Sequence, residues 1–67
     1  MTKATAATVS SALITAGYLP TVSVMGDGTT YIVEARTVAG AAVDASVVAT
    51  FASTNSVSAK VDMARFI

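Results

Sequence analysis

The stretch TVSVMGDGTTYIVEAR, residues 21–36, carries the clearest structural signal in the chain. Apolar and polar residues alternate on both sides of a Gly-Asp-Gly sequence, a pattern typical of two half-buried strands joined by a turn. A two-residue type I′ loop at Asp27-Gly28 would place Val24 opposite Tyr31 and Val22 opposite Val33. We favour this register because the alternating apolar residues of both strands then share one face. The sequence therefore predicts a β-hairpin over residues 21–36.

A helix over residues 4–16 is predicted to precede this hairpin. Thr2 or Thr5 can act as its N-cap, because a hydroxyl oxygen can accept a hydrogen bond from a free N–H of the first turn. Gly17 follows where a left-handed residue commonly ends a helix, and Pro20 cannot continue one. The apolar face expected for this helix comprises Ala6, Val9, Ala12, Leu13 and Ala16.

Residues 44–55 fit either a helix or a strand. In a helix over 44–54, Asp44 is the N-cap and Asn55 ends the element, whereas the same stretch also alternates apolar and polar residues as a strand does. We favour the helix because residues 7–13 and 45–51 resemble each other and each is followed by a break and a strand. That likeness is too faint to define a repeat. The helix would present Val47, Val48, Phe51 and Ala52 as its apolar face.

The final segment, residues 56–66, is predicted to form one strand. Val57, Ala59, Val61 and Met63 alternate with polar residues. Earlier in the chain, the connection between the hairpin and the second helix is predicted to turn at Gly40. The predicted fold is thus a single α+β domain of residues 1–67. It comprises an N-terminal helix, a β-hairpin, a second helix and a C-terminal strand, with both helices packed on one face of a small three-stranded sheet.

Composition excludes several classes of function. The chain of 67 residues has no Cys and no His, which excludes disulfides and the usual zinc sites. Four basic and four acidic residues are scattered along it, so we expect no nucleic-acid partner. No apolar run approaches the roughly 20 residues of a membrane span, and no signal peptide is visible. Hydroxyl groups such as those of Ser10 and Ser11 have no neighbouring base motif, so we expect neither catalysis nor a cofactor.

The composition also favours association with other proteins. Only 12% of the residues are charged, against about 25% in typical soluble domains. A domain of this size usually needs a disulfide, a metal or a partner chain to reach useful stability, and only the partner remains here. We expect the last strand to be a sheet edge whose apolar end recruits that partner. The predicted contact residues are Met63, Arg65, Phe66 and Ile67.

These observations predict a non-enzymatic structural subunit of a larger protein assembly. Small bacteriophage virion proteins, such as capsid-decorating or minor capsid subunits, have a comparable size and composition. A small protein-binding module that modulates a partner protein is the alternative. In either case we expect an intracellular or virion-associated location.

Overall fold

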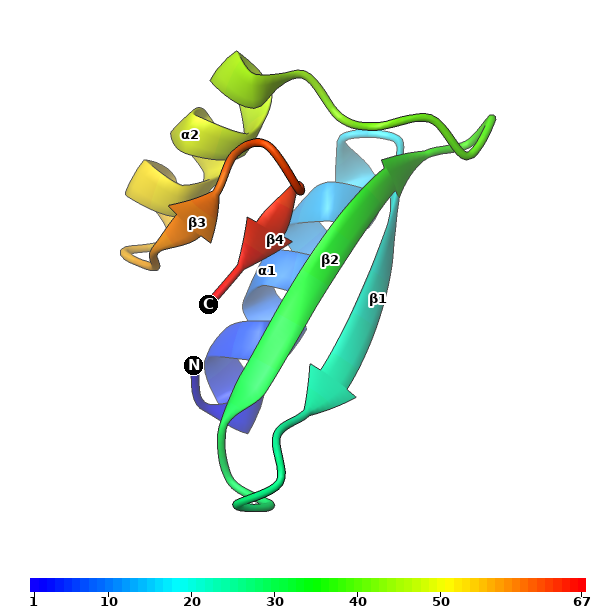
Figure 1. The fold of residues 1–67 in the computed structure, drawn as a ribbon. Coiled ribbons are helices and arrows are strands. Elements are labelled where there is room, and N and C mark those ends of the chain that lie inside the picture. Colours follow the sequence, from blue (N-terminus) through cyan, green and yellow to red (C-terminus); the bar gives the residue numbers. More distant parts are fainter.

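Two helices lie against one face of a four-stranded antiparallel sheet in the computed structural model, which describes all 67 residues (Figure 1). The sheet order is β1-β2-β4-β3, and helix α1 packs on β1 and β2 while α2 packs beside β3 and β4. This arrangement confirms the predicted α+β class with helices on one face of the sheet. The elements in chain order are α1 (Lys3–Thr15), β1 (Tyr18–Val24), β2 (Tyr31–Thr37), α2 (Ala45–Thr54), β3 (Ala59–Lys60) and β4 (Arg65–Phe66).

Helix α1 forms within one residue of its predicted bounds. The Thr2 hydroxyl accepts a hydrogen bond from the Thr5 backbone N–H (3.1 Å), and Gly17 follows the helix with a left-handed φ of 93°. Ala6, Val9 and Leu13 are buried against the sheet, as the period of the helix requires. Ala16, which was expected on the same face, is exposed because the helix ends there.

The first hairpin has the predicted register but a different turn. Val24 lies opposite Tyr31, as expected, yet only Gly28 has a left-handed φ (74°), so the turn is not type I′. Gly28 donates its backbone N–H to the Met25 carbonyl (3.0 Å), which closes a turn centred on residues 26–27. The Asp27 carboxylate explains this choice, because it accepts hydrogen bonds from the backbone N–H groups of residues 29 and 30 (both 2.9 Å).

Helix α2 resolves the ambiguous segment in favour of the helix. Asp44 caps it by accepting the backbone N–H of Ser46 (2.9 Å). At the other end, Ser56 and Val57 donate their backbone N–H groups back to the last turn, with Ser56 in the left-handed region (φ 56°). This is the Schellman arrangement, which satisfies carbonyls that the helix leaves free. Val48 and Ala52 are its buried residues.

The C-terminal segment forms two short strands, which corrects the prediction of one strand and a three-stranded sheet. Residues 61–64 make a tight turn in which Ala64 has a left-handed φ of 50°, and β4 runs back beside β3. Strand β4 also pairs with β2, placing Phe66 opposite Val33, so the end of the chain lies inside the sheet. The alternation of residues 57–63 concealed this reversal because no Gly, Pro or Asn marks the turn.

The core lies between the sheet and the two helices and contains ten buried residues. Aromatic rings link the part of the core beside β1 to the part beside β4. Phe51 of α2 makes edge-to-face contacts with Tyr18 of β1 and with Phe66 of β4, both with ring centroids 6.4 Å apart. The buried set is Ala6, Val9, Leu13, Val33, Ala35, Val43, Val48, Ala52, Ala64 and Phe66.

Candidate protein-contact surface

The four predicted contact residues do not form one surface. Phe66 is fully buried in the core, so its prediction as a contact residue is wrong. It lies on the helix-covered face because its partner Val33 does, and residues opposite each other in a sheet share a face. Met63 and Ile67 are each 41% exposed. Arg65 is half-buried and forms an ion pair with Glu34, with Nη2 and Oε2 3.6 Å apart.

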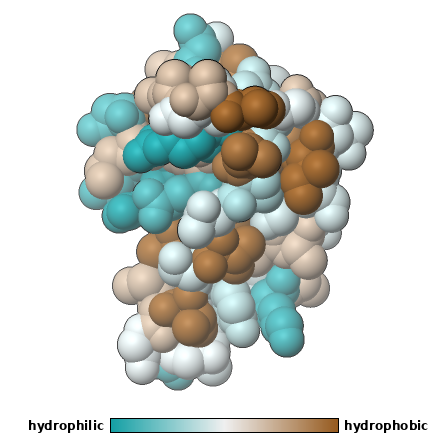
Figure 2. Space-filling view, turned by 90° about the vertical axis from the view of Figure 1, so that its right-hand side faces the viewer, coloured by the Kyte–Doolittle hydropathy of each residue, from teal (hydrophilic) through white to brown (hydrophobic).

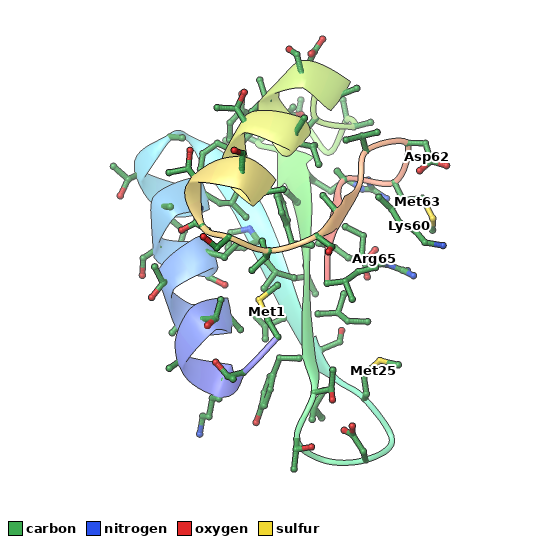
Figure 3. The ribbon with its side chains drawn as sticks, turned by 90° about the vertical axis from the view of Figure 1, so that its left-hand side faces the viewer. Met1, Met25, Lys60, Asp62, Met63 and Arg65 are labelled. Carbon is green, nitrogen blue, oxygen red and sulfur yellow. The ribbon has the colours of Figure 1, made fainter.

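The sheet face away from the helices is open and partly charged. Register places Lys60, Arg65 and Glu34 side by side across three strands on this face. In Figure 3 the side chains of Lys60, Met63 and Arg65 project from the sheet on the side opposite the helices. Charged side chains at the centre of a face favour solvent over an apolar partner. This face is therefore less suited to apolar docking than the sheet's long edge.

Strand β1 is that long edge, and sequence reasoning missed it. Leu19, Val22 and Val24 are 52%, 46% and 53% exposed, although Val22 and Val24 point to the helix side of the sheet. Helix α1 shields only the start of the strand, where Tyr18 and Pro20 are half-buried. Figure 2, which views the molecule from the β1 side, shows separate hydrophobic groups distributed from top to bottom.

Hydrogen bonds on β2 show which backbone groups of β1 are free. Ala35 donates its N–H to the Ala64 carbonyl (3.0 Å), on the side of β2 away from β1. Its partner on β1, Pro20, must then direct its backbone groups away from β2, and so must Val22 and Val24. The outer edge of β1 thus presents the N–H and C=O groups of two valines, and at Pro20 a C=O group alone.

One signal in the sequence pointed to this edge. Pro20 ended the predicted helix but in fact lies within β1, which begins at Tyr18. Proline inside a strand is tolerated where its missing N–H would face solvent, which is the situation of an edge. The seven residues of β1 also contain no charge, although charge is the usual protection of such an edge.

The two carboxylates with shifted pKa values have structural explanations. The pKa of Asp27 is lowered to about 2 by hydrogen bonds from the Thr30 hydroxyl and from turn N–H groups. The pKa of Asp44 is lowered by the Ser46 hydroxyl and backbone N–H, which belong to the α2 cap. A turn and a helix cap account for both shifts.

The structure contains no group of three or more acidic side chains that could hold a metal ion. Neither helix has the length and apolarity needed to cross a membrane.

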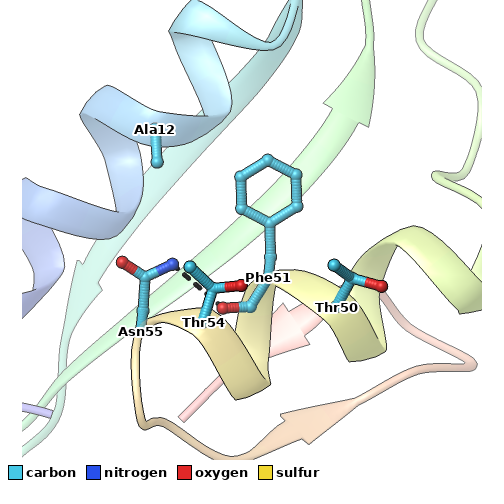
Figure 4. Close-up of a pocket in the computed structure, with 5 residues that line it drawn as sticks. All are labelled: Ala12, Thr50, Phe51, Thr54 and Asn55. Atoms are coloured by element: carbon cyan, nitrogen blue, oxygen red, sulfur yellow. Dashed lines mark hydrogen bonds between the residues drawn. The ribbon is translucent and has the colours of Figure 1, made fainter.

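A shallow hollow lies between the two helices (Figure 4). Its lining carries no titratable group, and the Asn55 side-chain amide is engaged with the Phe51 carbonyl (2.9 Å). The hollow therefore offers apolar contact and hydroxyl groups but no acid, base or activated nucleophile. It is lined by Ala12, Thr50, Phe51, Thr54 and Asn55.

Comparison of the chain with known protein families, with curated proteins and with solved structures finds no match. The candidate surface is consequently defined by geometry alone: the outer edge of β1, comprising Leu19, Pro20, Val22 and Val24.

Proposed function

We propose that this chain is a non-enzymatic structural subunit that joins a larger protein assembly through the β1 edge. The observation that carries the proposal is the combination of free backbone groups and exposed apolar side chains on one uncharged strand. Main-chain hydrogen bonds supply affinity when a strand is added to such an edge, and alternate side chains supply selectivity.

The distribution of exposed apolar side chains supports this proposal. Its accessible surface of 3899 Å² is close to the roughly 3,900 Å² expected for a folded monomer of 6.7 kDa. The exposed apolar side chains therefore belong to a molecule of ordinary compactness. They include Ile14, Val38, Val61 and Met63 as well as those of β1, so apolar surface occurs on several sides. A subunit that contacts more than one neighbour would use such a distribution.

A bacteriophage virion is the kind of assembly we favour, as a capsid-decorating or minor capsid protein, on the grounds of chain size and low charge. In such a particle, neighbouring subunits would supply the stabilisation that a core of ten residues gives only sparingly.

Gradient sedimentation of a lysate from the native host, with an antibody against the chain, tests the proposal. We expect the chain in a fast-sedimenting particle fraction at a fixed ratio to the other proteins of that particle. A chain that sediments at its own mass, or bound to one small partner, would instead favour the alternative of a module that modulates a partner protein.

A further inference from the structure

We propose that β1 pairs with β1 of a second copy across a two-fold axis, joining the two sheets into one continuous antiparallel sheet. The inference rests on the proposed function and names the first partner of the β1 edge as the chain itself. It requires only backbone groups and side chains that the folded monomer already exposes.

Strand β1 is better suited to this role than the opposite edge. Strand β3 is only two residues long and carries Lys60, with Asp62 in the adjoining turn. Short length and charge are two of the ways in which natural sheets prevent edge pairing. Strand β1 spans seven residues and has only Pro20 as protection, near its start. Its second half, Thr21–Val24, is exposed throughout.

The position of Pro20 selects one register for the pair. If Val22 of one copy lies opposite Val24 of the other, each pair exchanges both of its N–H···O=C bonds, and the pattern repeats on the other side of the axis. Pro20 then falls opposite Gly26 of the second copy, outside the bonded segment, where its missing N–H has no consequence. A register centred on Val22 would instead place Pro20 opposite Val24 and lose a bond at each end.

The side chains are compatible with this register on both faces. On the helix side, Val22 contacts Val24 of the other copy, so two half-exposed apolar side chains cover each other. On the open side, Ser23 lies opposite Ser23 at the two-fold axis. Because β1 carries no charge, two identical strands approach each other without repulsion. A typical stable interface of about 800 Å² per partner would cover about a fifth of the chain's 3899 Å².

A cysteine placed at the axis tests the register directly. The chain has no Cys, so Ser23→Cys provides its only thiol. Residues at position 23 of the two copies would form a non-hydrogen-bonded pair, with Cβ atoms about 4.5–5.5 Å apart, within reach of a disulfide after small adjustment. We expect mild oxidation to convert S23C into a covalent dimer.

Thr21→Cys is the matched control, on the same strand and the same face. In the proposed register the residues at position 21 of the two copies are offset by four residues along the strands. They are therefore about 13 Å apart, beyond the reach of a disulfide. We therefore expect T21C to remain monomeric under the same oxidation. Equal cross-linking of T21C and S23C, or none in S23C, would overturn the proposed pairing.

Charge reversal tests the pairing without a covalent bond. The double variant V22K/V24K places lysines opposite each other across the axis, and we expect its dimer dissociation constant in sedimentation equilibrium to rise at least about tenfold. V38K/V61K adds the same charge at two exposed valines outside the β1 edge, and we expect it to dimerise as the unmodified chain does. Mixing V22K/V24K with V22E/V24E should restore a dimer that neither variant forms alone.

These outcomes are separable from those of the proposed function. A chain that is monomeric up to millimolar concentration, with S23C uncross-linked, overturns self-pairing even if the chain is found in a particle. Dimerisation that V22K/V24K does not weaken overturns it as well, because the contact then lies elsewhere. Conversely, S23C cross-linking with no particle in the cell supports self-pairing and contradicts the larger assembly.

Discussion

Ser56 shows how a single residue limits the stability of this fold. It occupies the left-handed position after α2, where most helices of this type place glycine. The left-handed backbone costs an L-residue about 1–2 kcal/mol, and glycine's greater freedom in the unfolded chain offsets only part of that cost. We expect Ser56→Gly to raise the free energy of unfolding by about 0.5–1 kcal/mol in urea denaturation. Ser53→Gly, in the last turn of the helix, should lower it by about 0.5 kcal/mol. Equal effects of the two changes would contradict the Schellman end.

Asp27 gives stability a dependence on pH. Its pKa is held at about 2, below the ordinary 3.8, so the folded state favours the ionised carboxylate. The resulting stabilisation is complete above the pKa that Asp27 has in the unfolded chain. It is lost as the pH falls through the pKa that Asp27 has in the folded chain. We expect the urea midpoint to fall on acidification from about pH 4 to about pH 2, and to fall less in Asp27→Asn. Identical pH profiles of the unmodified chain and Asp27→Asn would show that the turn does not stabilise the ionised Asp27 carboxylate.

Prediction from sequence succeeded at residues whose effect is local. Thr2, Gly17 and Asp44 cap their helices as expected, because a cap depends on atoms within a few positions along the chain. The Asp27-Gly28 turn was assigned the wrong type because the turn type depends on which hydrogen bonds the Asp27 carboxylate accepts. Hydrogen bonds from Thr29 and Thr30 to the Asp27 carboxylate keep that residue out of the left-handed region.

Among the elements, α2 offers a sharp test with its own control. Ala49 lies in the helix interior, where proline would remove a backbone hydrogen bond and collide with the preceding turn, at a cost of about 3 kcal/mol or more. Ala45 is the first helical residue, where proline is tolerated, and Asp44 before it already has the extended ψ of 138° that a following proline requires. We expect Ala49→Pro to abolish the cooperative far-UV circular dichroism transition and Ala45→Pro to leave its midpoint nearly unchanged. Similar losses in both variants would contradict the helix.

The element that sequence reasoning placed wrongly was the last one. Alternation over 57–63 favours an extended strand, but the chain reverses at 61–64 because β4 can then pair with β2 and bury Phe66. That gain is tertiary and leaves no local signal, since the left-handed turn residue is Ala64 and not glycine. The predicted sheet edge changes for the same reason: β4 lies between β2 and β3, and the longer free edge is β1.

At the scale of the whole molecule, the two halves repeat one plan. Each consists of a helix that ends on a left-handed residue followed by two strands, α1-β1-β2 and α2-β3-β4. The sheet order β1-β2-β4-β3 is unchanged when the halves are exchanged, and the central strands β2 and β4 are antiparallel. The halves are thus joined as two copies would be around a two-fold axis. The first half has the longer strands, so β1 is the longer of the two sheet edges.

The junction between these halves carries the last prediction. Phe66 pairs with Val33 across the junction and contacts Phe51 of α2, so it joins both sheet halves and a helix. Phe66→Ala should cost about 3–5 kcal/mol, which equals the whole stability at the lower end of the roughly 3–10 kcal/mol expected for a domain of this size.

Ile67, the next residue along, is 41% exposed, and Ile67→Ala should cost only about 1 kcal/mol. Urea denaturation followed by far-UV circular dichroism, at one protein concentration because association would add stability, checks both values. We expect F66A to lack a folded baseline at room temperature while I67A retains one. A folded F66A with a midpoint near that of I67A would mean that the two halves are held together by contacts other than this aromatic junction.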